Sequence, residues 1–238
     1  MYFRAMTDEL QGMGLSDTLI SQESGNGTQL VAQLEDQRRQ LDELSESDEL
    51  GRQRLQLSIA ETLVALEKKE EAWQLARQVF DYMVSEQQWQ DAVEACDVMY
   101  AADQPDSIAA LGNGIWLSVT FPVDPQLSTN LLDHVIDETP KDSDGAAVAA
   151  ATAHYLVELR AKDEAQRTSL GFLTGNMLAG VANRHSDLKE KDQIDFWVER
   201  LELDQPDKFL PRLATMLDVI IGDKWWIDRD AIRANLPE

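Results

Sequence analysis

The side chains with the most reactive chemistry are three histidines and one cysteine, and their spacing argues against a shared site. His134, His154 and His185 are far apart, and no two histidines stand three or four residues from each other. None completes the Glu-x-x-His spacing of di-iron helical bundles. Cys96 has no glycine elbow or oxyanion motif beside it. We therefore expect these four residues to be structural, with no catalytic residue, metal or cofactor assigned.

Two short motifs resemble ligand loops but lack the residues that would complete them. Asp142-Ser143-Asp144-Gly145 begins like a calcium loop, but alanines and a valine occupy the next ligand positions. A helix N-cap at Ser143 or Asp144 explains the motif better. The glycine-rich stretch 171–180 has no Lys-Ser/Thr ending, so a phosphate-binding loop is not expected. Its glycines instead predict close packing of a helix against its neighbours.

The charge balance is strongly acidic and narrows the class of partner. The chain has 44 acidic and 21 basic residues, a formal net charge of −23. Such a chain repels phosphate backbones, and its basic residues do not cluster, so we expect no nucleic-acid partner. Two interpretations remain open: solubility, including adaptation to salt, or steering of a protein partner with a basic face.

Two sets of residues are candidates for partner binding. Asp133, Asp137 and Glu138 belong to an acidic run that only His134 and Lys141 offset. Further acids at Asp91, Glu94 and Asp97 predict a negative surface that extends this run. The second candidate is Trp225-Trp226, which either closes the end of the helical core or forms an exposed docking anchor.

Hydrophobic periodicity predicts an all-α fold. In residues 49–103 apolar positions recur at helical spacing in three consecutive segments, joined by turns of a few residues. Links this short force neighbouring helices to pack antiparallel, which predicts a helical hairpin array. The alanine-rich segment 146–153 predicts a central helix with close neighbours on several sides. No strand alternation is present, and further helices are expected at residues 28–44, 105–117, 125–136, 146–159, 164–183, 192–203, 206–221 and 225–232.

Composition changes along the chain predict its domain organisation. Residues 1–28 are expected to be a flexible N-terminal segment, with residues 1–5 resembling a remnant of an expression vector and 21–27 a turn-rich linker. Residues 29–238 are expected to form a single α-helical domain, with a subdomain boundary at 139–145. No apolar run is long enough to cross a bilayer, and a signal-peptide pattern is absent. With its single cysteine, the chain is expected to be cytoplasmic.

Part of the array resembles a tetratricopeptide repeat. Ala60, Ala72 and Ala76 fall at the small positions of that repeat, and Ile59 and Leu63 at larger positions of its first helix. A second helix of the same kind is similar over residues 89–99, so the resemblance covers about residues 55–103. It implies a TPR-like α-α superhelix with a groove for a protein partner, and it implies nothing about catalysis.

Two functions are compatible with these patterns. The first is a non-enzymatic protein–protein interaction module, such as an adaptor, a scaffold or an assembly factor, that uses a groove of the array and an acidic surface. The second is an enzyme whose carboxylates are brought together by the fold, since such groups need no local motif. Neither the identity of the partner nor the oligomeric state follows from the sequence.

Overall fold

The computed structural model describes the backbone of residues 15–236 and the side chains of residues 27–236, and it is all-α over that range. No strand occurs in this described part, so the predicted fold class, an all-α array of antiparallel hairpins, is confirmed; the TPR-like superhelix stays a prediction. The helices are α2 (Leu15–Glu43), α3 (Glu49–Ala65), α4 (Lys69–Ser85), α5 (Trp89–Ala101), α6 (Ser107–Thr120), α7 (Pro125–Glu138), α8 (Asp144–Arg160), α9 (Glu164–Ser186), α10 (Lys191–Arg200), α11 (Pro206–Ile221) and α12 (Arg229–Ala234).

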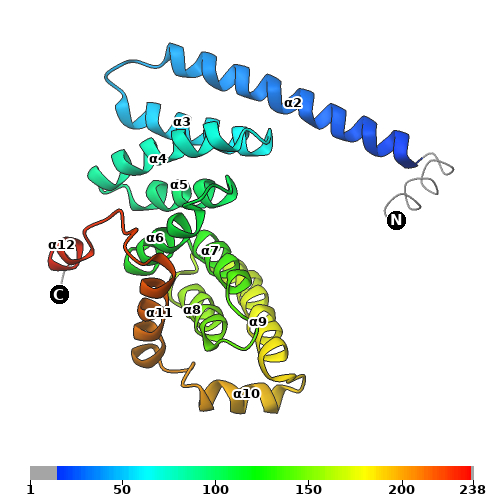
Figure 1. Cartoon of the computed structure of the whole chain (residues 1–238), viewed down its shortest axis with the longest axis vertical. Coiled ribbons are helices and arrows are strands. Elements are labelled where there is room, and N and C mark those ends of the chain that lie inside the picture. The colour runs from blue at the N-terminus through cyan, green and yellow to red at the C-terminus, as the bar shows by residue number, and fades with distance from the viewer. Residues whose placement is uncertain (1–14, 237–238) are drawn as a thin grey trace.

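Each helix from α3 to α9 packs against the next one in the chain (Figure 1). Contacts also join α3 with α5, α5 with α7 and α7 with α9, so these four helices form one row of the array. After α10 the chain reverses, and α11 packs against α8 and α6. Figure 1 shows the result: α12, near the C-terminus, lies beside the middle of the array rather than beyond α10.

The tight hairpins depend on a repeated turn. After α3, Glu67 takes the left-handed conformation with φ 58°, and the Lys68 N–H donates to Leu63 O at 2.9 Å. The turn after α4 repeats this form around Gln87, whose φ is 56°. This arrangement satisfies carbonyls at the helix end and reverses the chain within three residues. The short charged links therefore direct the next helix back along the preceding one.

A large core cluster extends through the array from α3 onward, and a second, smaller cluster joins α2, α3 and α4. Buried side chains in mutual contact run from Leu57 on α3 to Ile227 beyond α11, on both sides of the loop at residues 139–143. Residues 146–153 of α8 are all buried, with α7, α9 and α11 as neighbours, which confirms the predicted central helix. Ala72 and Ala76 have no exposed surface. These buried alanines allow neighbouring helices to pack closely in the core.

The glycines of α9 do not have the predicted role. A Cβ atom at Gly175 or Gly180 would meet nothing within 4 Å, so these glycines lie at open surface and allow no close packing. Close packing occurs instead on α6, where Gly112 lies against Ile221 and Gly114 against Cys96. The sequence pattern identifies positions that tolerate a near neighbour, but only the packing of the array decides which of them receive one.

Both ends of the described chain differ from the sequence prediction. Helix α2 begins at Leu15 and continues through residues 21–27, where a turn-rich linker and a cap at Thr28 were expected. Flexibility of this segment stays a prediction, and residues 1–14 lie outside the described part. At the other end, residues 225–228 precede α12 instead of opening a helix at 225. The two tryptophans of that segment make tertiary contacts with the array.

Candidate functional site

Three helices of one row, α3, α5 and α7, carry carboxylates that influence one another. Burial raises the pKa of Glu61, and the charges of Glu94 and Asp97 raise it further. Burial is also the main cause that raises the pKa values of Glu94 and Asp97. On α7 burial raises the pKa of Asp133, and the charge of Asp137 adds to the rise. We call the following group the acidic face: Glu61, Glu94, Asp97, Asp133, Asp137 and Glu138.

The acidic face lacks neutralising partners. Among the described side chains, no lysine or arginine forms an ion pair with any of its carboxylates. His134 contacts the face, with its Nε2 at 3.8 Å from Asp97 Oδ1. Arg184 lines a hollow beside Asp133 and Asp137 but forms no ion pair with either in the described part of the chain. Tyr100 donates its hydroxyl to Glu138 Oε1 at 2.9 Å. Burial, followed by this bond, raises the pKa of Tyr100 to about 12. Partly desolvated carboxylates without cations carry a free energy cost that a cationic partner would relieve.

The acids predicted from the sequence divide into two groups. Asp133, Asp137 and Glu138 are exposed on α7, and the first two line a hollow of about 230 Å³ between α7 and α9. Two other acids, Asp91 from the predicted negative surface and Asp144 from the predicted N-cap motif, are already paired. Asp91 binds Arg54 with an N–O distance of 2.9 Å. Asp144 binds His185 at 3.2 Å and Arg212 at 3.4 Å.

Glu61 is the member of the acidic face that sequence reasoning missed. It lies on α3, well before the acidic run in the sequence, and it is flanked by Ala60 and Thr62, which are buried. Its position on the outward side of a predicted amphipathic helix could be derived from the sequence. That it faces α5 became known only from the packing of α3 on α5.

Trp225 and Trp226 are partly buried and bind the C-terminal segment to the array. The ring of Trp226 makes edge contacts with Trp73 and Phe80, with centroid distances of 6.1 and 5.7 Å. Its backbone N–H donates to Asn113 Oδ1 at 3.1 Å. The guanidinium of Arg229 lies 3.6 Å from the ring centroid of Trp225. These contacts support the interpretation that the pair closes the core, and a docking role for either ring stays a prediction.

The reactive side chains occupy separate structural positions. Cys96 is fully buried, and burial raises the pKa of its thiol, which disfavours the reactive thiolate. His154 Nδ1 lies 2.9 Å from Thr174 Oγ1, joining α8 to α9. Within the described residues, no three His, Cys, Asp or Glu side chains gather as candidate metal ligands. The proximity of His134 to Asp97 is the one histidine contact with the acidic face.

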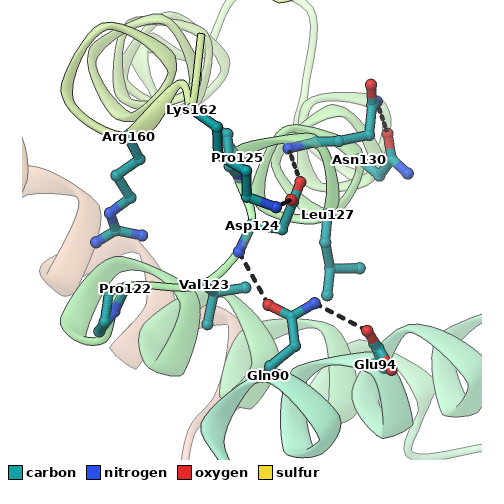
Figure 2. Close-up of a pocket in the computed structure, with 11 residues that line it drawn as sticks. Gln90, Glu94, Pro122, Val123, Asp124, Pro125, Leu127, Asn130, Arg160 and Lys162 are labelled. Carbon is teal, nitrogen blue, oxygen red and sulfur yellow. Dashed lines mark hydrogen bonds and ion pairs between the residues drawn. The ribbon is translucent and has the colours of Figure 1, made fainter. Parts of the chain in front are cut away.

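A large hollow adjoins the acidic face at Glu94 (Figure 2). It is a cavity of about 780 Å³ between α5, the α6–α7 loop and the end of α8. Gln90 spans one side of it: its Oε1 accepts from the Asp124 N–H at 2.9 Å, and its Nε2 donates to Glu94 Oε1 at 2.8 Å. Asp124 in turn pairs with Lys162 at 2.6 Å. The cavity thus combines charged groups of both signs with an open mouth.

The chain is an all-α helical-array protein with a carboxylate-lined row of helices. Comparisons with protein-family models, curated proteins and solved structures found no match to it. Among the described residues, no helix is both long and apolar enough to cross a lipid bilayer. Its function is therefore inferred from the geometry of its own surface.

Proposed function

We propose that this chain is a non-enzymatic protein–protein interaction module, an adaptor, scaffold or assembly factor, whose acidic face binds a basic face of another protein in the cytoplasm. The observation that carries the proposal is the set of carboxylates without cationic partners on α3, α5 and α7. Glu94 and Asp97 are half-buried, and Glu61 and Asp133 keep exposed surface. Partial desolvation nevertheless raises the pKa values of all four groups. Cations of a partner would stabilise the ionised form of these groups.

The geometry of the row supports a protein partner. Contacts between α3, α5 and α7 place their outward sides next to each other, so the charges form an extended surface rather than one point. An extended negative surface steers a positively charged protein during encounter and raises its association rate. Nucleic acid would be repelled by the same charges, because its phosphates are negative.

Association kinetics at several salt concentrations test the proposal. The partner is first isolated from the native host by affinity purification with this chain. Its association rate should fall markedly between low and high salt, since a Debye length of about 10 Å at 0.1 M screens exposed charges. Asp133→Lys with Asp137→Lys should reproduce part of that loss without unfolding the chain.

A matched double reversal on another surface provides the control. Glu199 and Asp204 are exposed near α10, outside the acidic face, so Glu199→Lys with Asp204→Lys makes the same change in net charge. The proposal requires the α7 variant to slow association more than this control does. If both variants change the association rate equally, or neither changes it, the acidic residues serve only solubility.

A further inference from the structure

The cavity beside Glu94 differs from the acidic face in its charge balance. Glu94 and Asp124 contribute two negative charges to its lining, and Arg160 and Lys162 contribute two positive ones. Lys162 and Asp124 neutralise each other through their contact of 2.6 Å. One cation and one anion remain, and each belongs to a different wall.

The unpaired cation is Arg160 on the α8 side. Its guanidinium donates to the carbonyl oxygens of Ser118 and Val119 at the end of α6, the second at 2.8 Å. A guanidinium has five N–H donors, so these two bonds leave three available. In the described part of the chain no carboxylate pairs with Arg160, and burial lowers the pKa of its side chain. An anion near the remaining donors would find a partly desolvated cation already oriented by α6.

The unpaired anion is Glu94 on the α5 side. Gln90 donates one hydrogen bond to it and is itself held by the backbone N–H of Asp124, so the carboxylate has a defined orientation. Figure 2 shows Gln90 and Glu94 on the α5 side, with Arg160 extending from α8 on the other. The two charges face the same hollow without neutralising each other.

Apolar side chains also form part of the lining of this cavity. Val123, which is buried, Leu127 and the exposed Pro122 lie in the lining. A long basic side chain can pack its methylene groups on such a surface while its charged end reaches a carboxylate. Carboxylates bind guanidinium groups in a planar, directional way, which suits an acidic group against Arg160.

We propose that this cavity receives a segment of the partner protein that carries a basic and an acidic side chain close together, the basic group against Glu94 and the acidic group against Arg160. The proposal rests on the proposed function and deepens it, because it assigns the cavity the role of selecting the partner's sequence. The acidic face alone favours any basic surface. The cavity adds a requirement for a negative group at a defined place, which excludes partners that are merely basic.

This inference can be tested by phage display. The whole chain is the target, and binding peptides are selected from a random library of twelve-residue peptides. Peptides enriched by the wild type should pair a lysine or arginine with an aspartate or glutamate within a few residues. When the Glu94→Lys variant is the target, the selected peptides should carry an acidic residue in place of the basic one. Peptides selected by the wild type should bind Glu94→Gln and Arg160→Gln at least tenfold more weakly. Asp204→Asn, which is exposed and lies outside both the cavity and the acidic face, should bind them within twofold of the wild type.

Arg160 also binds carbonyls of α6, so its variant is checked separately. The melting temperature of Arg160→Gln is measured, and Arg160→Lys, which keeps the positive charge, should retain the preference for an acidic residue in the peptide. Enriched peptides that are only basic, peptides whose binding ignores both cavity variants, or the absence of any enriched peptide would each overturn the inference. None of these outcomes affects the proposed function, which fails only if association with the native partner ignores salt and the α7 reversals.

Discussion

Gly114 on α6 lies directly against Cys96 on α5. A Cβ atom built on Gly114 would stand 2.7 Å from the Cβ of Cys96 and 3.4 Å from Leu131 Cδ1. The first distance is far inside van der Waals contact, and the atom it involves is fixed to the backbone of α5. The absence of a side chain at this position therefore sets how closely the α5–α6 hairpin can pack.

Replacement of this glycine should destabilise the fold. Gly114→Ala should lower the free energy of unfolding by roughly 1–3 kcal/mol, because α5 and α6 must separate to accept the methyl group. The same change at Gly175, which has nothing within 4 Å, should stabilise the chain by about 0.5–1 kcal/mol, since alanine favours an exposed helix interior. Denaturant unfolding of both variants measures the two effects, and changes of the same sign would contradict the assigned packing.

Enlargement of a buried alanine tests the α4 interface. Ala76 has no exposed surface, so Ala76→Leu should destabilise the chain by roughly 1–3 kcal/mol through overpacking. Ala165 is exposed in the first turn of α9, and Ala165→Leu should change the stability by less than about 0.5 kcal/mol. The comparison uses thermal unfolding, and an unchanged melting temperature for Ala76→Leu would show that the buried side of α4 is assigned wrongly.

The C-terminal segment should depend on Trp226. Its ring contacts Trp73 and Phe80, and the guanidinium of Arg77 lies 4.6 Å from its centroid. Trp226→Ala should therefore cost about 3 kcal/mol, near the lower end for loss of a packed aromatic ring. Phe172, 75% exposed on α9, provides the control, because Phe172→Ala should have little effect.

Limited proteolysis gives a second measure of the same variant. Loss of Trp226 should expose residues 223–236 to cleavage while the hairpins α3–α9 stay intact. If the segment remains protected in Trp226→Ala, its attachment depends on α12 and on the hydrogen bonds of Asn113 rather than on the tryptophan ring.

Stability should vary with pH in a way that the acidic face determines. Burial raises the pKa values of Glu61 and Glu94 in the folded chain. Each group therefore contributes stability that is fully present below the ordinary carboxyl pKa of about 4 and is lost as the pH rises through the raised value. Glu61→Gln with Glu94→Gln should consequently be more stable than the wild type at pH 7, with the difference shrinking towards pH 4.

Asp124 supplies a control of opposite sign. Burial acts to raise its pKa, but the bonds from Lys162 and from the backbone N–H of Gln126 outweigh it, and the net shift is downward. Its contribution is present above the ordinary carboxyl pKa and is lost as the pH falls through the lowered value. Asp124→Asn should thus destabilise the chain at pH 7 and less so in acid. Parallel pH profiles for the two variants would contradict the assigned environments.

Local structure could be predicted from the sequence alone, because helical periodicity, caps and turn residues act over a few neighbouring positions. The three hairpin helices between residues 49 and 103, the N-cap at Asp124 with Pro125 in the first turn, and the stop of α11 before Gly222 were all readable from it. The buried alanines of α8 followed from the same pattern, since small residues on every side imply neighbours on several sides.

The contacts between distant residues, by contrast, could not be predicted from the sequence and follow from how the helices pack. The row α3, α5 and α7 brings Glu61 beside Glu94 and Asp97, pairs Asp91 with Arg54, and so separates free carboxylates from neutralised ones. It also placed the close approach at Gly114 rather than at Gly175, and it drew Trp226 onto α4. These outcomes depend on the distance between helix surfaces, which is set by the summed packing of the whole array and has no signature in a local window of sequence.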